Sequence, residues 1–412
     1  MITRRDAARL AVISAAAALA STGSAGAQGA AKVIKVGIDL SLTGADAESA
    51  TRILHGAQMA FDTANTKREI PGYQLQVITY DDGTATAGQY DPAQAATNAR
   101  KMIGDGVVAA VGPMMSGAGK AMAPILSEGD LATITPSSTN PDITDAKFAS
   151  EYMPAGKAIY FRTVTTDAFQ GPELANFFAE KLGVKTVYIL DDSGAYGVGL
   201  ADAFQKEAEA KGIKVLGRDR LDPKAADYSA VLTKIKALHP DALYYGGVGQ
   251  AGVKLAKQAY DIIPDVIKGA GDGMYSVEML NGAGYPANQG WYATIASPHT
   301  TEDADAAAWV KAYNDKWHTQ PDDYAITAYD AGLVIVDAIK RVVAAGKPVN
   351  KDTVRDAIQT SKVRTLQGTI SFDKDGDLTD RTISIFQIKQ DKNYPADDIL
   401  HQYHYIGVAP QA

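Results

Sequence analysis

Short apolar runs alternate with amphipathic stretches along the chain from residue 33 onward. The apolar runs, such as residues 33–40 and 132–135, have the length of buried strands. Between the runs, apolar residues recur three and four positions apart, as they do over residues 53–61, which is the spacing of one helix face. This alternation predicts an α/β fold in which helices cross between parallel strands.

Two sets of these elements follow one another, and a third group closes the chain. In the first set we expect helices at 53–61, at 92–103 and after Ser116, and strands at 33–40, 74–80, 107–111 and 132–135. In the second set we expect helices at 173–181, 201–211, 228–238 and 253–260, and strands at 186–190, 214–216, 242–245, 266–268 and 291–295. The closing group has helices at 306–317, 325–345 and 351–360, and strands at 369–372 and 382–388.

The domain organisation follows from length and from the missing linker. A chain of 412 residues is too long for one compact core, and no low-complexity segment separates the two sets. We therefore expect short strand-like crossings, which together would form a hinge, near residues 161–165, 293–297 and 382–385. The first lobe would comprise residues 32–165 and 298–382, and the second lobe residues 166–297 and 383–412.

The first 27 residues have the pattern of a cleaved export signal. Arg4 and Arg5 precede an apolar run at residues 10–20, and small residues stand at 25–27, where a signal peptidase would cut. The arginine pair leaves both general secretion and twin-arginine export open. No later apolar run reaches the roughly 20 residues of a spanning helix, so we expect a soluble periplasmic protein.

Composition removes several classes of function. The formal net charge is -8, the wrong sign for a surface that follows nucleic acid phosphates. The chain has no cysteine, which excludes disulfides, thiolate metal ligands, Cys nucleophiles and a lipid anchor on cysteine. Its 6 histidines are scattered, and no convincing catalytic set is present. We therefore expect no metal, no cofactor and no nucleic acid partner.

Hydroxyl side chains follow two neighbouring strands of the first set. Ser116 stands where a strand turns into a helix, and Ser137 and Thr139 follow the next strand. Ligands of open α/β sheets bind outside the carboxyl ends of the strands, where helix N-termini favour an anion such as a carboxylate. Ordinary helix capping explains the same residues equally simply.

Two residues of the second set occupy the same kind of position. Asp272 follows the strand at 266–268 among glycines and could pair with an ammonium group, although a solvated turn would also use an aspartate there. Tyr196 follows the strand at 186–190 and could cover a ligand, or it could simply pack on the surface.

One motif suggests a different function. The segment 247–252 matches G-x-G-x-x-G, follows a strand and opens a helix, and Asp272 stands 20 residues beyond Gly252. That is the context of a dinucleotide site, so an exported NAD-dependent oxidoreductase is an alternative hypothesis. Nothing else in the sequence identifies a nicotinamide site or a hydride acceptor.

Several segments in order along the chain resemble the periplasmic branched-chain amino acid binding proteins of ABC transporters. They are Val36-Gly37 with Ser41-Leu42-Thr43-Gly44, Tyr80-Asp81-Asp82, Thr135-Pro136-Ser137-Ser138-Thr139, Asp192 with Tyr196-Gly197, Tyr244-Tyr245-Gly246-Gly247, and Phe372-Asp373-Lys374-Asp375-Gly376-Asp377. The resemblance implies a type I periplasmic binding fold, with two Rossmann-like lobes, three crossovers and one ligand enclosed in the cleft. It also implies a monomeric receptor that delivers its ligand to an inner-membrane permease, with no enzymatic step.

The resemblance also implies the site residues. Ser116 and Thr139, with the Ser137 backbone, would hold the amino acid's α-carboxylate and α-ammonium, Asp272 would pair with the ammonium, and Tyr196 would cover the ligand. Two tyrosines expected for Leu, Ile or Val binders are replaced, and the pocket wall is expected at Ser49, Val248, Tyr324, Met114 and Met115. These departures suggest an enlarged pocket and leave aromatic acids, amides or urea as alternative ligands.

Overall fold

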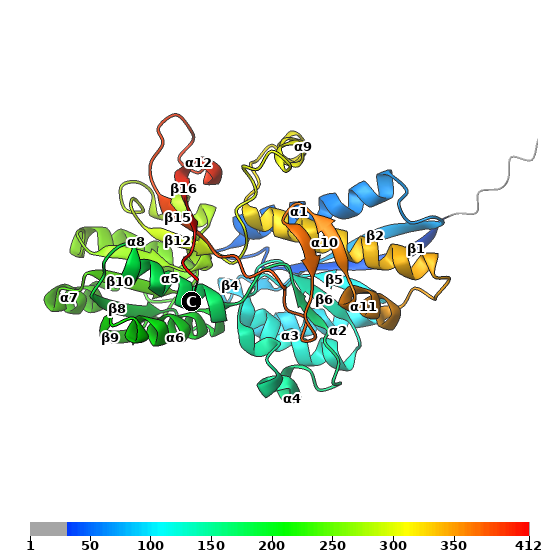
Figure 1. Ribbon diagram of the computed structural model, residues 1–412, viewed down its shortest axis with the longest axis horizontal. Coiled ribbons are helices and arrows are strands. Elements are labelled where there is room, and N and C mark those ends of the chain that lie inside the picture. The colour runs from blue at the N-terminus through cyan, green and yellow to red at the C-terminus, as the bar shows by residue number, and fades with distance from the viewer. Residues whose placement is uncertain (1–30, 412) are drawn as a thin grey trace, which may run out of the picture.

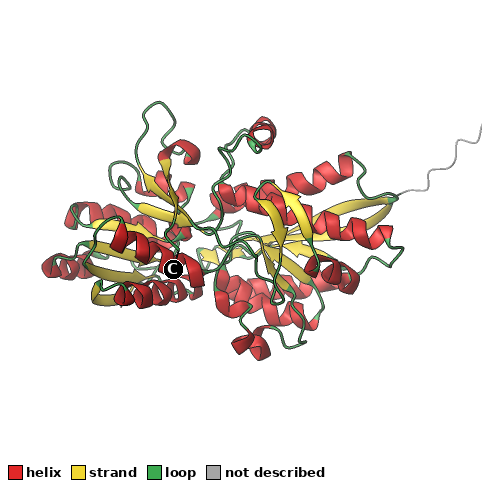
Figure 2. Ribbon diagram, in the orientation of Figure 1, coloured by secondary structure: helices red, strands yellow, loops and turns green. Residues whose placement is uncertain are grey.

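Two separate β-sheets, each covered by helices, divide the chain into two lobes that lie side by side along the long axis (Figure 1). The computed structural model describes residues 31–411. The predicted signal peptide at 1–27 lies outside the described residues. Helices and strands alternate through most of the chain, which confirms the α/β class (Figure 2).

The first sheet is parallel throughout and has the order β2-β1-β5-β6-β7. Its strands are β1 (Lys32–Leu40), β2 (Tyr73–Asp81), β5 (Ala109–Val111), β6 (Ala132–Thr135) and β7 (Tyr160–Arg162). Its helices are α1 (Ala47–Thr66), α2 (Pro92–Asp105), α3 (Ser116–Glu128), α10 (Asp323–Ala344) and α11 (Lys351–Gln359). The central strands β5 and β6 are buried at every position, as expected of parallel strands covered on both faces.

The second sheet has the order β16-β15-β12-β11-β10-β8-β9. Its strands are β8 (Thr186–Asp191), β9 (Lys214–Arg220), β10 (Ala242–Gly246), β11 (Ile267–Ala270), β12 (Tyr292–Ile295), β15 (Ser384–Ile388) and β16 (Tyr403–Val408). Its helices are α5 (Asp167–Glu180), α6 (Ala195–Ala210), α7 (Ser229–Leu238) and α8 (Gly249–Ile262). Strand β15 pairs antiparallel with both β12 and β16, so this edge of the sheet departs from the parallel pairing predicted for the alternating strands.

Smaller elements complete the fold. Two short antiparallel pairs are formed by β3 (Gly83–Thr84) with β4 (Gln89–Tyr90) and by β13 (Lys362–Thr365) with β14 (Gly368–Ser371). The remaining α-helices are α4 (Ala149–Tyr152), α9 (Ala307–Trp317) and α12 (Ile399–Gln402).

Three chain segments cross between the lobes next to one another. The Thr165 N–H donates to the Ala296 carbonyl at 2.8 Å, and the Ser384 hydroxyl donates to the Ser297 carbonyl at 2.8 Å. These bonds join the crossings after β7, after β12 and before β15. The lobe boundaries at residues 165, 297 and 382 stay a prediction, placed within these crossings.

The sequence pattern put four helix starts too late, including that of α1, which begins at Ala47 instead of near residue 53. Helix α5 begins at Asp167 and continues through Pro172, α6 begins at Ala195, and α8 begins at Gly249. Glycine or proline near the starts of α5, α6 and α8 interrupted the helical pattern in the sequence, because both residues are poor helix formers in a helix interior. Because these helices begin earlier than predicted, Tyr196 lies in the first turn of α6, and Val248 is the N-cap residue of α8.

Helices α1 and α10 approach closely at Gly56. A Cβ atom at this position would collide with the Ala325 carbonyl of α10. Since α10 carries Tyr324 in its first turn, this contact helps to position a predicted site residue.

We expect Gly56→Ala to lower the free energy of unfolding by about 1–3 kcal/mol, because the added methyl group forces the two helices apart. Urea denaturation measures this change. The control is Gly104→Ala in α2, where a Cβ meets nothing within 4 Å and should stabilise the protein by about 0.5–1 kcal/mol. Equal stability of the two variants would contradict the close approach.

Candidate functional site

A cavity lies between the lobes and gathers residues from widely separated parts of the sequence. Its empty space is about 500 Å³, part of it open to solvent. The lining residues are Asp46, Ser49, Met114, Met115, Ser116, Ser137, Tyr196, Val248, Asp272, Gly273, Tyr275, Ser276 and Tyr324. This set includes all ten predicted site residues except Thr139.

The loop from β1 to α1 is held by one carboxylate. Asp81 accepts hydrogen bonds from the N–H groups of Leu42, Thr43 and Gly83 at 2.8–3.2 Å. The Thr43 hydroxyl also donates to Asp81, at 2.6 Å. The segments 41–44 and 80–82, noted in the sequence, therefore fix the start of α1, which supplies Ser49 to the cavity.

The N-terminus of α3 faces the cavity without a side-chain cap. Met115 is the N-cap residue and Ser116 is the first helical residue, so interpreting Ser116 as the N-cap is wrong. The Ser116 Oγ accepts a hydrogen bond from the Asn140 N–H at 3.2 Å. Both Met115 and Ser116 line the cavity, so the positive end of the helix dipole is available to an anion there.

The loop that follows β6 is anchored from behind by Arg162, a residue that the sequence analysis missed. Its guanidinium is fully buried, donates to the Ser138 and Asn140 carbonyls at 2.5 and 2.8 Å, and pairs with Asp377 at 2.8 Å. Asp377 belongs to the turn at 373–377. Arg162 thus positions the backbone around Ser137.

Thr139 is fully buried and is absent from the cavity lining, unlike the other predicted residues. Its side chain lies beside Asp167, where it lowers the pKa of that carboxyl. The reason is the course of the loop, which turns Thr139 behind the surface that Ser137 presents to the cavity. Thr139 is therefore the one predicted site residue that the structure does not place in the cavity lining.

Asp272 connects the two lobes within the cavity. One carboxylate oxygen accepts the Tyr196 hydroxyl and the other accepts the Tyr324 hydroxyl, each at 2.5 Å. The Tyr196 hydroxyl also accepts a hydrogen bond from the Gly273 N–H at 2.9 Å. Tyr196 comes from the second lobe and Tyr324 from the first, so both predicted tyrosines converge on the predicted carboxylate.

Burial raises the pKa of the Asp272 carboxyl above its ordinary value, although the two tyrosine hydroxyls oppose this shift. Asp167 is also fully buried, and burial together with the Asp272 charge raises the pKa of its carboxyl well above the usual range. Gln170 links the two residues, because its Oε1 accepts from the Asp272 N–H at 2.8 Å and its Nε2 donates to Asp167 at 2.9 Å. A cation in the cavity would favour the ionised form of Asp272, which lines it.

The dinucleotide motif at residues 247–252 is occupied by the chain itself. Tyr245 fills the space beside Gly247, and Met274 fills the space beside Gly252. The Asp46 carboxylate lies next to Gly249 at the N-terminus of α8, where a pyrophosphate would have to bind. A carboxylate in that place repels phosphate, so the geometry does not support a nicotinamide site.

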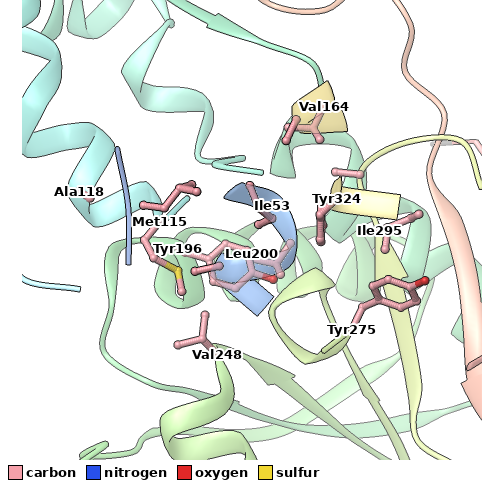
Figure 3. Close-up of a cluster of buried hydrophobic side chains, with 14 of the residues drawn as sticks. Ile53, Met115, Ala118, Val164, Tyr196, Leu200, Val248, Tyr275, Ile295 and Tyr324 are labelled. Carbon is pink, nitrogen blue, oxygen red and sulfur yellow. The ribbon is translucent and has the colours of Figure 1, made fainter. Parts of the chain in front are cut away.

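The rest of the lining is mainly apolar. Figure 3 shows Met115, Tyr196 and Val248 converging from different elements, with Tyr275 and Tyr324 beside them. Of these residues, sequence reasoning missed Tyr275, along with Asp46, Gly273 and Ser276. Gly273, Tyr275 and Ser276 directly follow Asp272, so their closeness to a predicted residue was the available signal.

Direct hydrogen bonds close the cleft. Glu278 of the second lobe accepts the Ser49 N–H at 2.8 Å and the Ser49 hydroxyl at 2.5 Å. Asn140 donates to the Ala195 carbonyl at 3.0 Å, and Gln250 donates to the Ala87 carbonyl at 3.3 Å. Because Ser49 lies in the first turn of α1, Glu278 caps that helix from across the cleft.

Within residues 31–411, no helix is long and apolar enough to cross a membrane. The same part of the chain contains no cluster of three His, Asp or Glu side chains arranged to hold a metal ion.

Sequence comparison finds relatives over most of the chain. The profile of a periplasmic binding protein family matches residues 33–393. The Leu/Ile/Val-binding protein BraC3 of Rhizobium johnstonii is 31% identical over 366 residues, which cover 88% of this chain and 94% of the relative. A leucine-, isoleucine-, valine-, threonine- and alanine-binding protein of Pseudomonas aeruginosa is 30% identical, with 91% and 95% of the two chains covered.

Solved structures show the same fold. The leucine-binding protein LivK of Thermotoga maritima superposes with a TM-score of 0.78 at 24% identity, covering 91% of this chain and 98% of that one. A solute-binding protein of R. palustris in complex with benzoate superposes with a TM-score of 0.74 at 20% identity, covering 92% and 97%. These likenesses confirm the type I fold expected from the sequence.

We expect Glu278→Ala to favour the open arrangement, because it removes two hydrogen bonds to a charged group, each worth about 1.5–3 kcal/mol. Small-angle X-ray scattering of the ligand-free protein should show a larger radius of gyration than for the wild type. Glu128→Ala, an equal charge change at an exposed position in α3, is the control and should leave the radius unchanged. Indistinguishable radii for Glu278→Ala and wild type would show that Glu278 does not hold the cleft closed.

Proposed function

Since the chain belongs to the periplasmic binding protein family, we propose that it binds an amino acid in the cleft and delivers it to a membrane permease of an ABC importer. One observation carries this proposal. A buried carboxylate, Asp272, and an uncapped helix N-terminus, that of α3, line the same cavity. An α-amino acid carries the two charges that these groups complement.

The ammonium group would bind at Asp272. Each oxygen of this carboxylate accepts one tyrosine hydroxyl and keeps a second lone pair for another donor. No cationic side chain of the described residues lines the cavity, so the charge of Asp272 has no partner there from the chain. An ammonium would supply that partner and favour the ionised carboxyl.

The carboxylate group would bind at the first turn of α3, beside Ser116. The Ser137 hydroxyl donates to the Met114 carbonyl at 3.0 Å, so this side chain braces the neighbouring loop. Ser137 would therefore contribute its backbone to the cavity wall, as the sequence analysis expects. Thr139 would act indirectly on the site, through the neighbouring Asp167 behind the cavity wall.

The ligand side chain would lie against Met114, Met115, Val248 and Tyr275. These apolar walls suit branched aliphatic side chains, and the relatives named above are described as binding Leu, Ile and Val. Aromatic carboxylates, which one neighbour binds, are the second class to test. A benzoate lacks an ammonium and would leave Asp272 without a cation, so an amino acid fits this cavity better.

Export would place the protein in the periplasm after removal of residues 1–27, by either the general or the twin-arginine route. The permease would contact both lobes near the cleft, since it must distinguish the closed from the open form. We propose that the receptor acts as a monomer. Binding and release by lobe closure and opening involve no covalent step.

We expect Asp272→Ala to weaken amino acid binding by about 2–5 kcal/mol, because the ammonium would lose the carboxylate proposed to pair with it in an enclosed site. Isothermal titration calorimetry with Leu, Ile, Val, Thr and Ala identifies the ligand and measures the loss. The control is Asp261→Ala, which removes an exposed carboxylate of α8. Unchanged affinity in Asp272→Ala, or binding of benzoate in preference to every amino acid, would contradict the assignment.

A further inference from the structure

Asp46 is an N-cap aspartate that does not cap its own helix. It precedes α1, yet its side chain makes no capping hydrogen bond. The N–H group of Ser49, which an N-cap aspartate ordinarily binds, is taken by Glu278 from the other lobe at 2.8 Å. The Asp46 carboxyl group is thereby released from its helix and lines the cavity.

The surroundings of Asp46 leave one of its oxygens without a donor. The residue is only 5% exposed, and its Oδ2 accepts no hydrogen bond from any residue between 31 and 411. The Gly249 N–H at the start of α8 is the one group that lowers the pKa of this carboxyl, whereas burial, Glu278 and Asp192 raise it to about 7. Tyr90, whose own pKa is raised in part by Asp46, adds no positive charge.

A buried acceptor without a donor is costly, and most such groups in proteins are satisfied. Within residues 31–411, no donor binds Asp46 Oδ2 and no cationic side chain lines the cavity. Because Asp46 lies in the wall of the ligand cavity, a bound ligand can supply a donor to this oxygen. Asp272 already receives two tyrosine hydroxyls, whereas Asp46 Oδ2 receives nothing.

We propose that Asp46 recognises a hydroxyl or amide donor on the ligand's side chain, so that the cleft prefers a donor-bearing amino acid to its apolar isostere. This inference rests on the proposed amino acid function and specifies its substrate class. With the α-ammonium at Asp272 and the α-carboxylate at α3, Asp46 is left for the side chain. The walls formed by Met115 and Val248 would hold the apolar part of that side chain.

Threonine and valine test the proposal, because they differ by a hydroxyl in place of a methyl group at nearly equal volume. Asparagine and leucine form a second pair of similar size. In calorimetric titrations of the wild type, we expect threonine to bind about tenfold or more tightly than valine, and asparagine more tightly than leucine. A site built to bond a donor rejects the analogue that lacks it more strongly than an apolar pocket rejects a hydroxyl.

Substitution of Asp46 separates the side-chain role from a role at the α-ammonium. In Asp46→Ala, the preference for threonine over valine should disappear, because the affinity for threonine should fall much more than the affinities for valine and alanine. Asp46→Asn keeps an acceptor of the same shape and should retain part of the preference. If Asp46→Ala does not fold, the two ligand pairs on the wild type still decide the question.

Three outcomes would overturn the inference, and they are distinguishable. Equal binding within both pairs by the wild type would reject the role of Asp46 and leave amino acid binding intact. A loss of alanine and valine binding in Asp46→Ala as large as the loss of threonine binding would place the α-ammonium at Asp46. Failure of the wild type to bind any amino acid would reject the proposed function and, with it, this inference.

Discussion

Among residues 31–411, no cationic side chain lines the cavity where the carboxyl groups of the cleft are buried, and this constraint shapes the interface between the lobes. Asp272 is held by hydroxyl groups from both lobes, and Asp46 lies between α1 and α8 with one oxygen unsatisfied. Burying an unpaired charge costs free energy, so a ligand that brings a positive charge and hydrogen-bond donors stabilises the closed cleft. Such a ligand favours closure because it pairs with the same carboxyl groups whose burial makes closure costly without it.

Helix N-termini are the second feature on which the cleft depends. They can bind a group from outside the helix because their own side-chain caps are missing. Neither α3 nor α8 has a side-chain cap, and α1 receives its carboxylate from Glu278 of the opposite lobe. A cap supplied across the cleft is present only when the lobes meet, so helix stability and closure are coupled. Helix α2, which is capped by its own Asp91, lacks this coupling, and none of its residues lines the cavity.

Much of the fold and of the site could be predicted, because both follow from local pattern. Residues after strand ends gather at the same end of a parallel sheet, as Ser116 and Ser137 do in one lobe and Tyr196 and Asp272 in the other, and the cavity between the lobes brings the two groups together. Arg162 could not be predicted, since its partners at 138–140 and at Asp377 are brought together only by the tertiary fold. The strand β16 was missed because its exposed positions include apolar residues, which blurs the alternation that marks a strand.

The substituted tyrosine positions illustrate why a site cannot be deduced residue by residue from a family pattern. The replacement of a tyrosine by Ser49 suggested a larger apolar pocket, but the Ser49 hydroxyl is used to bind Glu278. That bond occupies the first turn of α1 and thereby frees Asp46, three residues earlier, to face the cavity. The change at position 49 therefore alters the polarity of the site through a neighbouring residue. Tyr275 supplies an aromatic wall from another element, so the ring lost at one position has a counterpart at another.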